Sequence, residues 1–109
     1  MISWEDFEKI DIRVGTILAV DDFPKARNPS YQLKIDFGPE GIKHSSAQIT
    51  DLYSKETLIG KQVIAVINFP PKQIANFFSE CLVLGVYNSK KEVVLLQPTH
   101  TVENGDKIG

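Results

Sequence analysis

The stretch from Val63 to Leu84 constrains the fold more than any other part of the sequence. It begins with an apolar, β-branched run from Val63 to Ile67, the composition of a strand that is covered on both faces. Pro70 and Pro71 end that strand, because proline has no N–H for a strand ladder. A second apolar run begins at Cys81. We therefore expect two core strands separated by a loop that is rich in proline and aromatic residues.

Three segments before this stretch have the patterns of strands. Residues 11–20 alternate so that one face carries Ile12, Val14, Thr16, Leu18 and Val20, while Gly15 indicates a bulge or a sharp bend. Residues 31–37 alternate most regularly, and their apolar face carries Tyr31, Leu33, Ile35 and Phe37. A turn at 38–41 leads into a more polar strand at 42–47, so these last two strands are expected to form a hairpin.

The order of the elements indicates an all-β protein with short helices. We expect a short helix at 49–53, a small strand at 93–96 and a tight turn from Glu103 to Asp106. Three strands, a helix and two strands form the connectivity of an OB-fold, a five-stranded Greek-key barrel. An SH3-like barrel is the alternative, but the helix after the third strand favours the OB-fold. The expected organisation is one domain, residues 1–109, with an N-terminal helix and a short β-rich C-terminal extension.

The N-terminal residues are typical of a short amphipathic helix. Ser3 and Asp6 have the spacing of a capping box, and Trp4, Phe7 and Ile10 recur on one helical face. This apolar stripe either packs on the barrel of its own chain or joins a dimer interface. The acidic start is unlike a signal peptide, and no apolar run approaches the roughly 20 residues that span a bilayer. We therefore expect a cytoplasmic protein without membrane insertion.

Signatures of catalysis and of metal binding are weak. His44 adjoins Ser45 and Ser46, but adjacent strand residues point to opposite faces and no nearby acid would orient the histidine. A metal site would have to combine His44, His100 and Cys81, which lack paired ligand spacing. The single cysteine excludes an internal disulfide and is best explained as a small buried residue. We expect a non-enzymatic binding protein without cofactor or metal.

Two sets of residues could form a binding surface. Cations on the first three strands and on the central loop could pair with RNA phosphates: Arg13, Lys34, Lys43 and Lys72. The proline-rich and aromatic residues of the central loop could stack on bases or grip an extended polypeptide: Phe69, Pro70, Pro71, Phe77 and Phe78. One of the adjacent phenylalanines could instead close the barrel end as core. The net charge of −2 argues against strong nonspecific binding to nucleic acid.

Several segments together resemble a known family. They are Asp11–Ile17, Ser45–Ile49, Ile67–Pro71, Ser79–Gly85 and the Gly-Asp-Lys-Ile-Gly run at 105–109. These motifs resemble the tRNA-binding-domain family, an OB-fold module that is appended to some methionyl-tRNA synthetases. Over nearly the whole chain they are similar to its short free-standing bacterial branch, the CsaA proteins. The combination of motifs is specific, although each one alone is weak.

The resemblance implies a partner for the apolar helix and a role for the protein. It implies a homodimer whose interface includes the N-terminal helix and the C-terminal segment, with Trp4, Phe7 and Ile10 as interface residues. It also implies a cytoplasmic chaperone that acts in protein export. The implied partners are unfolded preproteins and the SecA translocation ATPase.

The resemblance adds two residues to the expected RNA-binding set. In the tRNA-binding relatives, the serine of a Ser-x-Gly-Met motif and the asparagine after the fourth strand belong to the RNA-binding region. Ser79 and Asn68 match these positions, whereas Glu80 and Cys81 depart from the motif. The alternative function is therefore that of a tRNA-binding accessory protein.

Overall fold

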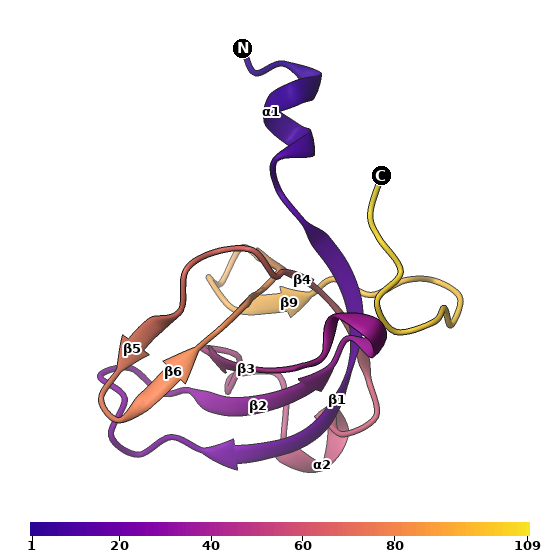
Figure 1. Cartoon of the computed structure of the whole chain (residues 1–109). Coiled ribbons are helices and arrows are strands. Elements are labelled where there is room, and N and C mark those ends of the chain that lie inside the picture. Colours follow the sequence, from indigo (N-terminus) through magenta and orange to yellow (C-terminus); the bar gives the residue numbers. More distant parts are fainter.

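The computed structural model describes residues 1–109 and contains the barrel that the sequence predicts (Figure 1). Its main sheet is antiparallel, with the strand order β3-β2-β1-β4-β7. These strands are β1 (Ile12–Asp22), β2 (Tyr31–Asp36), β3 (Ile42–Ala47), β4 (Gln62–Val66) and β7 (Leu82–Val83). The short 3-10 helix η1 (Gly38–Glu40) joins β2 to β3, and α2 (Lys55–Leu58) lies between β3 and β4. The nearly closed barrel confirms the OB-fold.

Two small hairpins form separate two-stranded sheets beside the main sheet. The segment that we expected to be a loop contains β5 (Lys72–Ile74) and β6 (Phe77–Ser79), which pair across a two-residue turn. The prediction failed because each strand has only three residues and the turn lacks glycine. Ala75 occupies the left-handed region at φ 54°. The second hairpin pairs β8 (Gly85–Tyr87) with β9 (Val93–Leu95), close to the small strand expected at 93–96.

The alternating strand at 31–37 is the centre of the core, as its pattern predicts. Leu33, Ile35 and Phe37 are fully buried and face Val63 and Ala65 of β4 across the barrel interior. The predicted face of β1 is correct only in part. The register of β1 against β2 shifts between Ile17 and Ala19, which turns Ile17 inward and leaves Leu18 exposed.

Gly15 therefore does not mark the bulge. It is buried beneath the ring of Phe37, where an added Cβ would lie 2.7 Å from Phe37 Cδ1 and from Ile35 Cγ2. The close approach of strand and ring requires glycine at this position.

The helix expected at 49–53 lies further along the chain, at α2. α2 begins after Ser54, whose side chain accepts from the Thr57 N–H in a capping box. Residues 49–53 form a loop instead, in which Ile49 is buried and the Tyr53 hydroxyl accepts a hydrogen bond from the Leu95 N–H at 3.0 Å. The capping residue, and not the preceding apolar residues, fixes where the helix starts. No helix in the structure is both long and apolar enough to cross a membrane.

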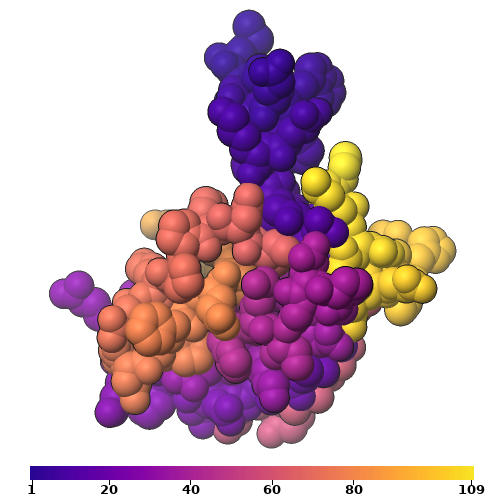
Figure 2. Space-filling model, viewed as in Figure 1, coloured from indigo at the N-terminus to yellow at the C-terminus, as the bar shows by residue number.

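The N-terminal helix α1 (Trp4–Glu8) stands away from the barrel as an arm (Figure 2). Its capping box between Ser3 and Asp6 is formed as predicted. Trp4 is 86% exposed and Ile10 is also exposed, so the stripe does not pack on its own barrel. The first of the two interpretations of this stripe is therefore wrong for this structure.

Asn68 ties the base of the arm to the barrel. Its Nδ2 donates to the Lys9 carbonyl oxygen at 2.8 Å, and its Oδ1 accepts from the Asp11 N–H at 2.9 Å. The Ile67 N–H also donates to the Asp11 carbonyl oxygen, at 2.9 Å. These three bonds fix the direction in which the arm leaves the barrel.

The C-terminal segment returns beside the start of β1. The Gly105 N–H donates to the Val14 carbonyl oxygen at 2.7 Å, and the Ile108 N–H donates to that of Ile12 at 2.9 Å. The expected β-rich extension is thus partly the β8–β9 hairpin and partly a tail that continues the sheet beyond β1. Both ends of the chain lie on the same side of the molecule (Figure 1).

Candidate functional site

A large depression follows the line along which the barrel does not close. β3 and β7 are the two edges of the main sheet and share no strand ladder. Between them lies an open groove of about 670 Å³. One wall is formed by residues 46–51, the other by 79 and 81–85, and the rim by Asn28, Pro29, Lys72, Tyr87 and Lys91. We call this groove the seam.

Side chains close one end of the seam in place of a strand ladder. The Glu80 N–H donates to the His44 carbonyl oxygen at 2.7 Å, and the His44 N–H donates to Glu80 Oε1 at 2.9 Å. The Ser46 N–H donates to Ser79 Oγ at 3.1 Å. The buried Ser45 hydroxyl donates to the Cys81 carbonyl oxygen at 3.0 Å. Carboxylate and hydroxyl oxygens therefore satisfy the N–H groups of the β3 edge, which protects that part of the edge from pairing.

Burial and hydrogen bonding explain the pKa shifts of the ionisable groups at this closed end. Burial raises the pKa of the Cys81 thiol to about 12, so the thiol stays protonated and unreactive. Partial desolvation acts to raise the pKa of Glu80, but hydrogen bonds from the His44 N–H and imidazole outweigh it and lower the pKa. His44 Nδ1 lies 3.1 Å from Glu80 Oε1. The arrangement holds two segments together and contains no activated nucleophile.

Replacing Glu80 with glutamine is expected to weaken the protein in a pH-dependent way. A carboxyl whose pKa is lowered by folding stabilises the native state above its unfolded pKa, and this contribution is lost as the pH falls through the folded pKa. The loss in Glu80→Gln should be below about 1 kcal/mol at pH 7, because the carboxylate is 38% exposed and solvent screens it. Urea unfolding between pH 3 and 7 measures the difference, with the exposed Glu56→Gln on α2 as the matched control. A difference from wild type that persists unchanged at pH 3 would contradict this assignment.

The structure separates the two phenylalanines that the sequence left unresolved. Phe77 is half-buried and packs edge-on against Phe23, with ring centroids 5.3 Å apart. Its ring also approaches His44, at 6.3 Å between centroids. Phe78 points to the other face of the hairpin and is 55% exposed, and Phe69 is exposed to a similar extent. Phe77 therefore closes the barrel surface, whereas Phe78 and Phe69 are free to contact a partner.

Pro70 and Pro71 are exposed beside Phe69, in the segment that follows β4. None of the five residues of the expected peptide-binding set lines the seam. Four members of the set are therefore exposed, and only Phe77 packs against the barrel.

The expected RNA-binding cations do not form one patch. Arg13 is engaged inside the chain: its Nε donates to Asp11 Oδ1 at 2.7 Å and its Nη1 donates to the Gly105 carbonyl oxygen at 3.0 Å. A further ion pair joins Arg13 Nη2 to Glu40 Oε1 at 3.2 Å. Lys34 is exposed on the outer face of β2, opposite His44 of β3. Lys72 stands on the rim of the seam, and Lys43 is half-buried near Glu80.

Comparisons with known proteins agree with the OB-fold of this structure. The family model described as "Putative tRNA binding domain" matches residues 12–107. This chain belongs to the tRNA-binding-domain family. The structure of the CsaA chaperone protein from Picrophilus torridus is 58% identical, covers 100% of both chains and superposes with a TM-score of 0.94. That of the chaperone CsaA from Bacillus anthracis is 51% identical with a TM-score of 0.95, covering 100% of this chain and 99% of that one. The chain is thus of the CsaA type.

The family also includes parts of much larger enzymes. The methionine–tRNA ligase of Nanoarchaeum equitans is 37% identical over 108 residues, and that of Pyrococcus furiosus is 36% identical over 107 residues. This chain spans 14% of the length of each of these ligases. The match therefore identifies the accessory tRNA-binding domain and does not extend to the catalytic part of the enzymes.

Ser79 and Asn68, which the family resemblance added to the expected RNA-binding set, make hydrogen bonds within this chain. Ser79 accepts the Ser46 N–H at the closed end of the seam, and its hydroxyl also approaches the Cys81 carbonyl oxygen at 3.4 Å. Asn68 holds the base of the N-terminal arm. Ser79 lines the seam and Asn68 does not. In this family member, both side chains therefore organise the surfaces beside which a ligand would lie.

Sequence reasoning missed the open part of the seam. Gln48, Val83, Tyr87 and Lys91 all line it, yet they come from three separate segments. The polar run at residues 43–46 was the one available signal, because it indicates a strand with one face in water. It does not reveal that the edge remains open beyond Ala47.

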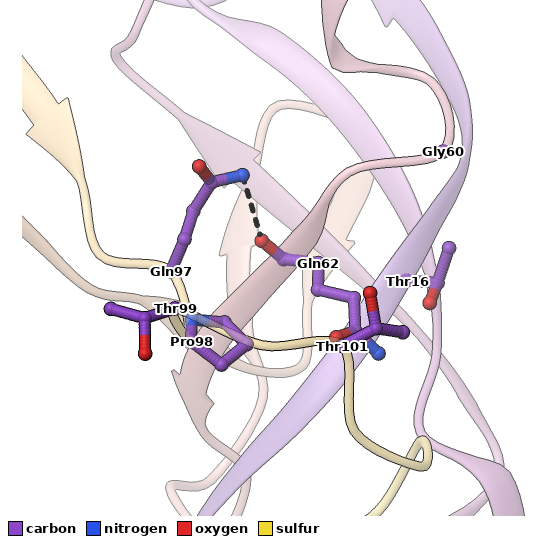
Figure 3. Close-up of a pocket in the computed structure, with 7 residues that line it drawn as sticks. All are labelled: Thr16, Gly60, Gln62, Gln97, Pro98, Thr99 and Thr101. Carbon is purple, nitrogen blue, oxygen red and sulfur yellow. Dashed lines mark hydrogen bonds between the residues drawn. The ribbon is translucent and has the colours of Figure 1, made fainter.

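A second, smaller depression is lined by uncharged residues (Figure 3). It measures about 280 Å³ and lies between the barrel and the C-terminal segment, with Thr16, Gly60, Gln62, Gln97, Pro98, Thr99 and Thr101 around it. Gln97 Nε2 donates to the Gln62 carbonyl oxygen at 3.3 Å. The Gln62 side chain in turn donates to the Val102 carbonyl oxygen and accepts from its N–H. These bonds attach the C-terminal segment to the barrel beside the depression.

Proposed function

We propose that this protein is a homodimeric chaperone that binds unfolded preproteins and assists their export from the cytoplasm, with the SecA translocation ATPase as a partner. The observation that carries the proposal is the combination of exposed apolar rings with an open apolar groove on one small barrel. Phe69 and Phe78 are each more than half exposed, and the seam contributes further apolar lining. Full-length similarity to two CsaA chaperones supports the same conclusion.

The physical basis of client binding would be burial of apolar surface. Each square ångström of apolar surface removed from water contributes about 25 cal/mol. The seam and the exposed ring of Phe78 offer an extended chain two separate apolar contacts. Weak contacts at both places would give affinity without selecting one sequence, as a chaperone requires.

The proposed interface of the homodimer is the N-terminal arm. Trp4 and Phe7 of α1, and Ile10 just after it, are apolar residues of an arm that is held away from its own barrel. The C-terminal segment lies beside the base of the arm, as Figure 1 shows. An exposed tryptophan next to exposed aliphatic side chains marks a surface that another molecule covers. In a homodimer, each chain would cover the arm of the other.

Phe78→Ala is expected to weaken the binding of an unfolded preprotein. Loss of an aromatic anchor at an interface reduces binding free energy by about 1–2 kcal/mol, which is roughly 5–30-fold in Kd. Fluorescence titration with a urea-denatured preprotein measures the change. Ile59→Ala, which removes an equally exposed apolar side chain near α2, should leave the affinity unchanged. Equal affinities of Phe78→Ala and wild type would remove Phe78 from the client surface.

tRNA binding is the second candidate, and the match of the family model over residues 12–107 favours it. Exposed Lys72 and Lys91 on the rim of the seam could contact phosphates. If tRNA binds, the logarithm of affinity should fall with the logarithm of salt by about 0.7–0.9 per phosphate contact. Lys72→Gln should reduce this slope by about one contact. A gel-shift experiment without any complex at low salt would exclude this function.

A further inference from the structure

The open end of the seam exposes main-chain groups on both of its walls. On the β3 wall, the N–H groups of His44 and Ser46 point towards the seam and are satisfied there by Glu80 and Ser79. Backbone groups of a strand point to the same side at every second residue. Gln48 directly follows Ala47, the last residue of β3, and its main chain makes no hydrogen bond within the protein. The β3 edge is therefore capped at His44 and Ser46, and the main chain just beyond the strand is unpaired.

The β7 wall presents a matching open residue. The Leu84 N–H donates to the Ile64 carbonyl oxygen at 2.8 Å, and Val83 is paired with Ala65. In an antiparallel ladder this spacing makes Val83 and Ala65 a non-hydrogen-bonded pair, so the N–H and carbonyl of Val83 point away from β4. They point towards the seam, where no strand pairs with β7.

The side chains around these groups suit a polypeptide. Leu82, Val83 and Leu84 line one wall, while Ile49, Ile74 and Val93 add further apolar surface. The charged residues of the lining are Lys72, Lys91 and Asp51, so the seam is locally positive on a chain with a net charge of −2. Two lysines complement the carboxylates of a peptide, whereas affinity for a nucleic acid backbone depends on many cations.

We propose that the open end of the seam binds one extended polypeptide segment as an added strand, with apolar side chains in the groove and an acidic flank near Lys72 and Lys91. The client main chain would bond with the free groups of Gln48 and Val83. Main-chain pairing is independent of client sequence and gives affinity to any extended chain. This proposal rests on the proposed chaperone function and specifies its binding mode.

Substitutions on the two walls test the site. Gln48→Pro removes the free N–H, and Ala47, a strand residue, already has the extended backbone that a following proline requires. It should weaken binding about tenfold, whereas Gln48→Ala, which keeps the N–H, should bind normally. Leu82→Glu places a charge in the groove and should also weaken binding about tenfold. Its matched control is Leu18→Glu, because Leu18 is 42% exposed against 50% for Leu82 but lies outside the seam.

Modified peptides test the binding mode without changing the protein. The probe is a synthetic eight-residue Val/Thr peptide with glutamates at both ends, titrated against the wild-type chain by fluorescence polarisation. N-methylation of a peptide N–H that pairs with the seam should weaken binding about tenfold or more, and methylation of its neighbours should have little effect. The sensitive positions should therefore alternate along the peptide. A probe with lysines at both ends should bind more weakly.

The outcomes separate this proposal from the proposed function. Alternating sensitivity to N-methylation, together with losses in Gln48→Pro and Leu82→Glu, would support strand addition in the seam. If the peptide and a denatured preprotein both bind but these changes have no effect, the seam is overturned and the chaperone function stands. If neither binds the wild-type protein, the chaperone function itself fails. If Leu82→Glu abolishes binding of tRNA and leaves peptide binding intact, the seam is a nucleic acid site and the proposal is overturned.

Discussion

Phe37→Ala is expected to destabilise the protein by about 3–5 kcal/mol, the usual range for truncating a buried phenylalanine. The ring is 0% exposed, and β1 approaches it so closely that only glycine fits at position 15. Its carbonyl oxygen lies 2.6 Å from where a Cβ on Gly105 would be, so the C-terminal segment packs against the same residue. Phe37 therefore supports the barrel core, the turn before β3 and the C-terminal tail together.

Urea unfolding followed by circular dichroism measures this loss. Phe69→Ala is the matched control, because it removes the same side chain from a position that is 53% exposed. We expect the control to change stability by less than about 0.5 kcal/mol. A domain of this size has a total stability of about 5–15 kcal/mol, so Phe37→Ala should lower the midpoint markedly and could unfold the chain at 37 °C. A small and equal effect of both substitutions would show that the ring of Phe37 does not organise the core.

Regular alternation explains what the sequence could predict. The strand at 31–37 was correct because each apolar residue of that run faces the same interior. The OB-fold followed from the order of such strands and from a helix between the third and the fourth. The barrel was therefore predictable from local patterns alone.

The errors arose where tertiary contacts replace a local pattern. The shift between Ile17 and Ala19 in β1 leaves no mark in the sequence, so Leu18 was assigned to the wrong face. The β5–β6 hairpin turns through Ala75 at a positive φ, whereas turn prediction expects glycine there. Phe77 and Phe78 are both apolar, and only the pairing of the hairpin determines which one packs on Phe23.

The candidate site was less predictable than the fold. A polar residue at a family binding position can also serve to hold the chain together by hydrogen bonds. Ser79 and Asn68 were chosen for a resemblance to RNA-binding positions, and the structure engages both in hydrogen bonds within the chain. The open groups of the seam belong to the main chain, which every residue carries. A sequence reveals side chains, so a site made of unpaired main-chain groups becomes visible only when the strand order is known.

Trp4→Ala is expected to dissociate the proposed homodimer. Interface tryptophans are among the residues that contribute most to association, and truncating one at the centre of an interface reduces binding by about 2–4 kcal/mol, or roughly 30–1000-fold in Kd. Trp4 is 86% exposed on an arm whose direction is fixed by Asn68, so a partner can cover the whole ring without rearrangement of the barrel. Ile10, at the base of the arm, is 38% exposed and would add apolar area to the contact.

Sedimentation across a range of concentrations tests this prediction, because the monomer has a mass of 12.2 kDa. The wild-type protein should sediment at twice that mass and Trp4→Ala at the monomer mass, while Leu52→Ala, which changes an exposed side chain on the loop before α2, should remain dimeric. Trp4 is the only tryptophan, so its fluorescence should also become less accessible to a soluble quencher as the dimer forms. A wild-type protein that sediments only at 12.2 kDa would disprove the dimer.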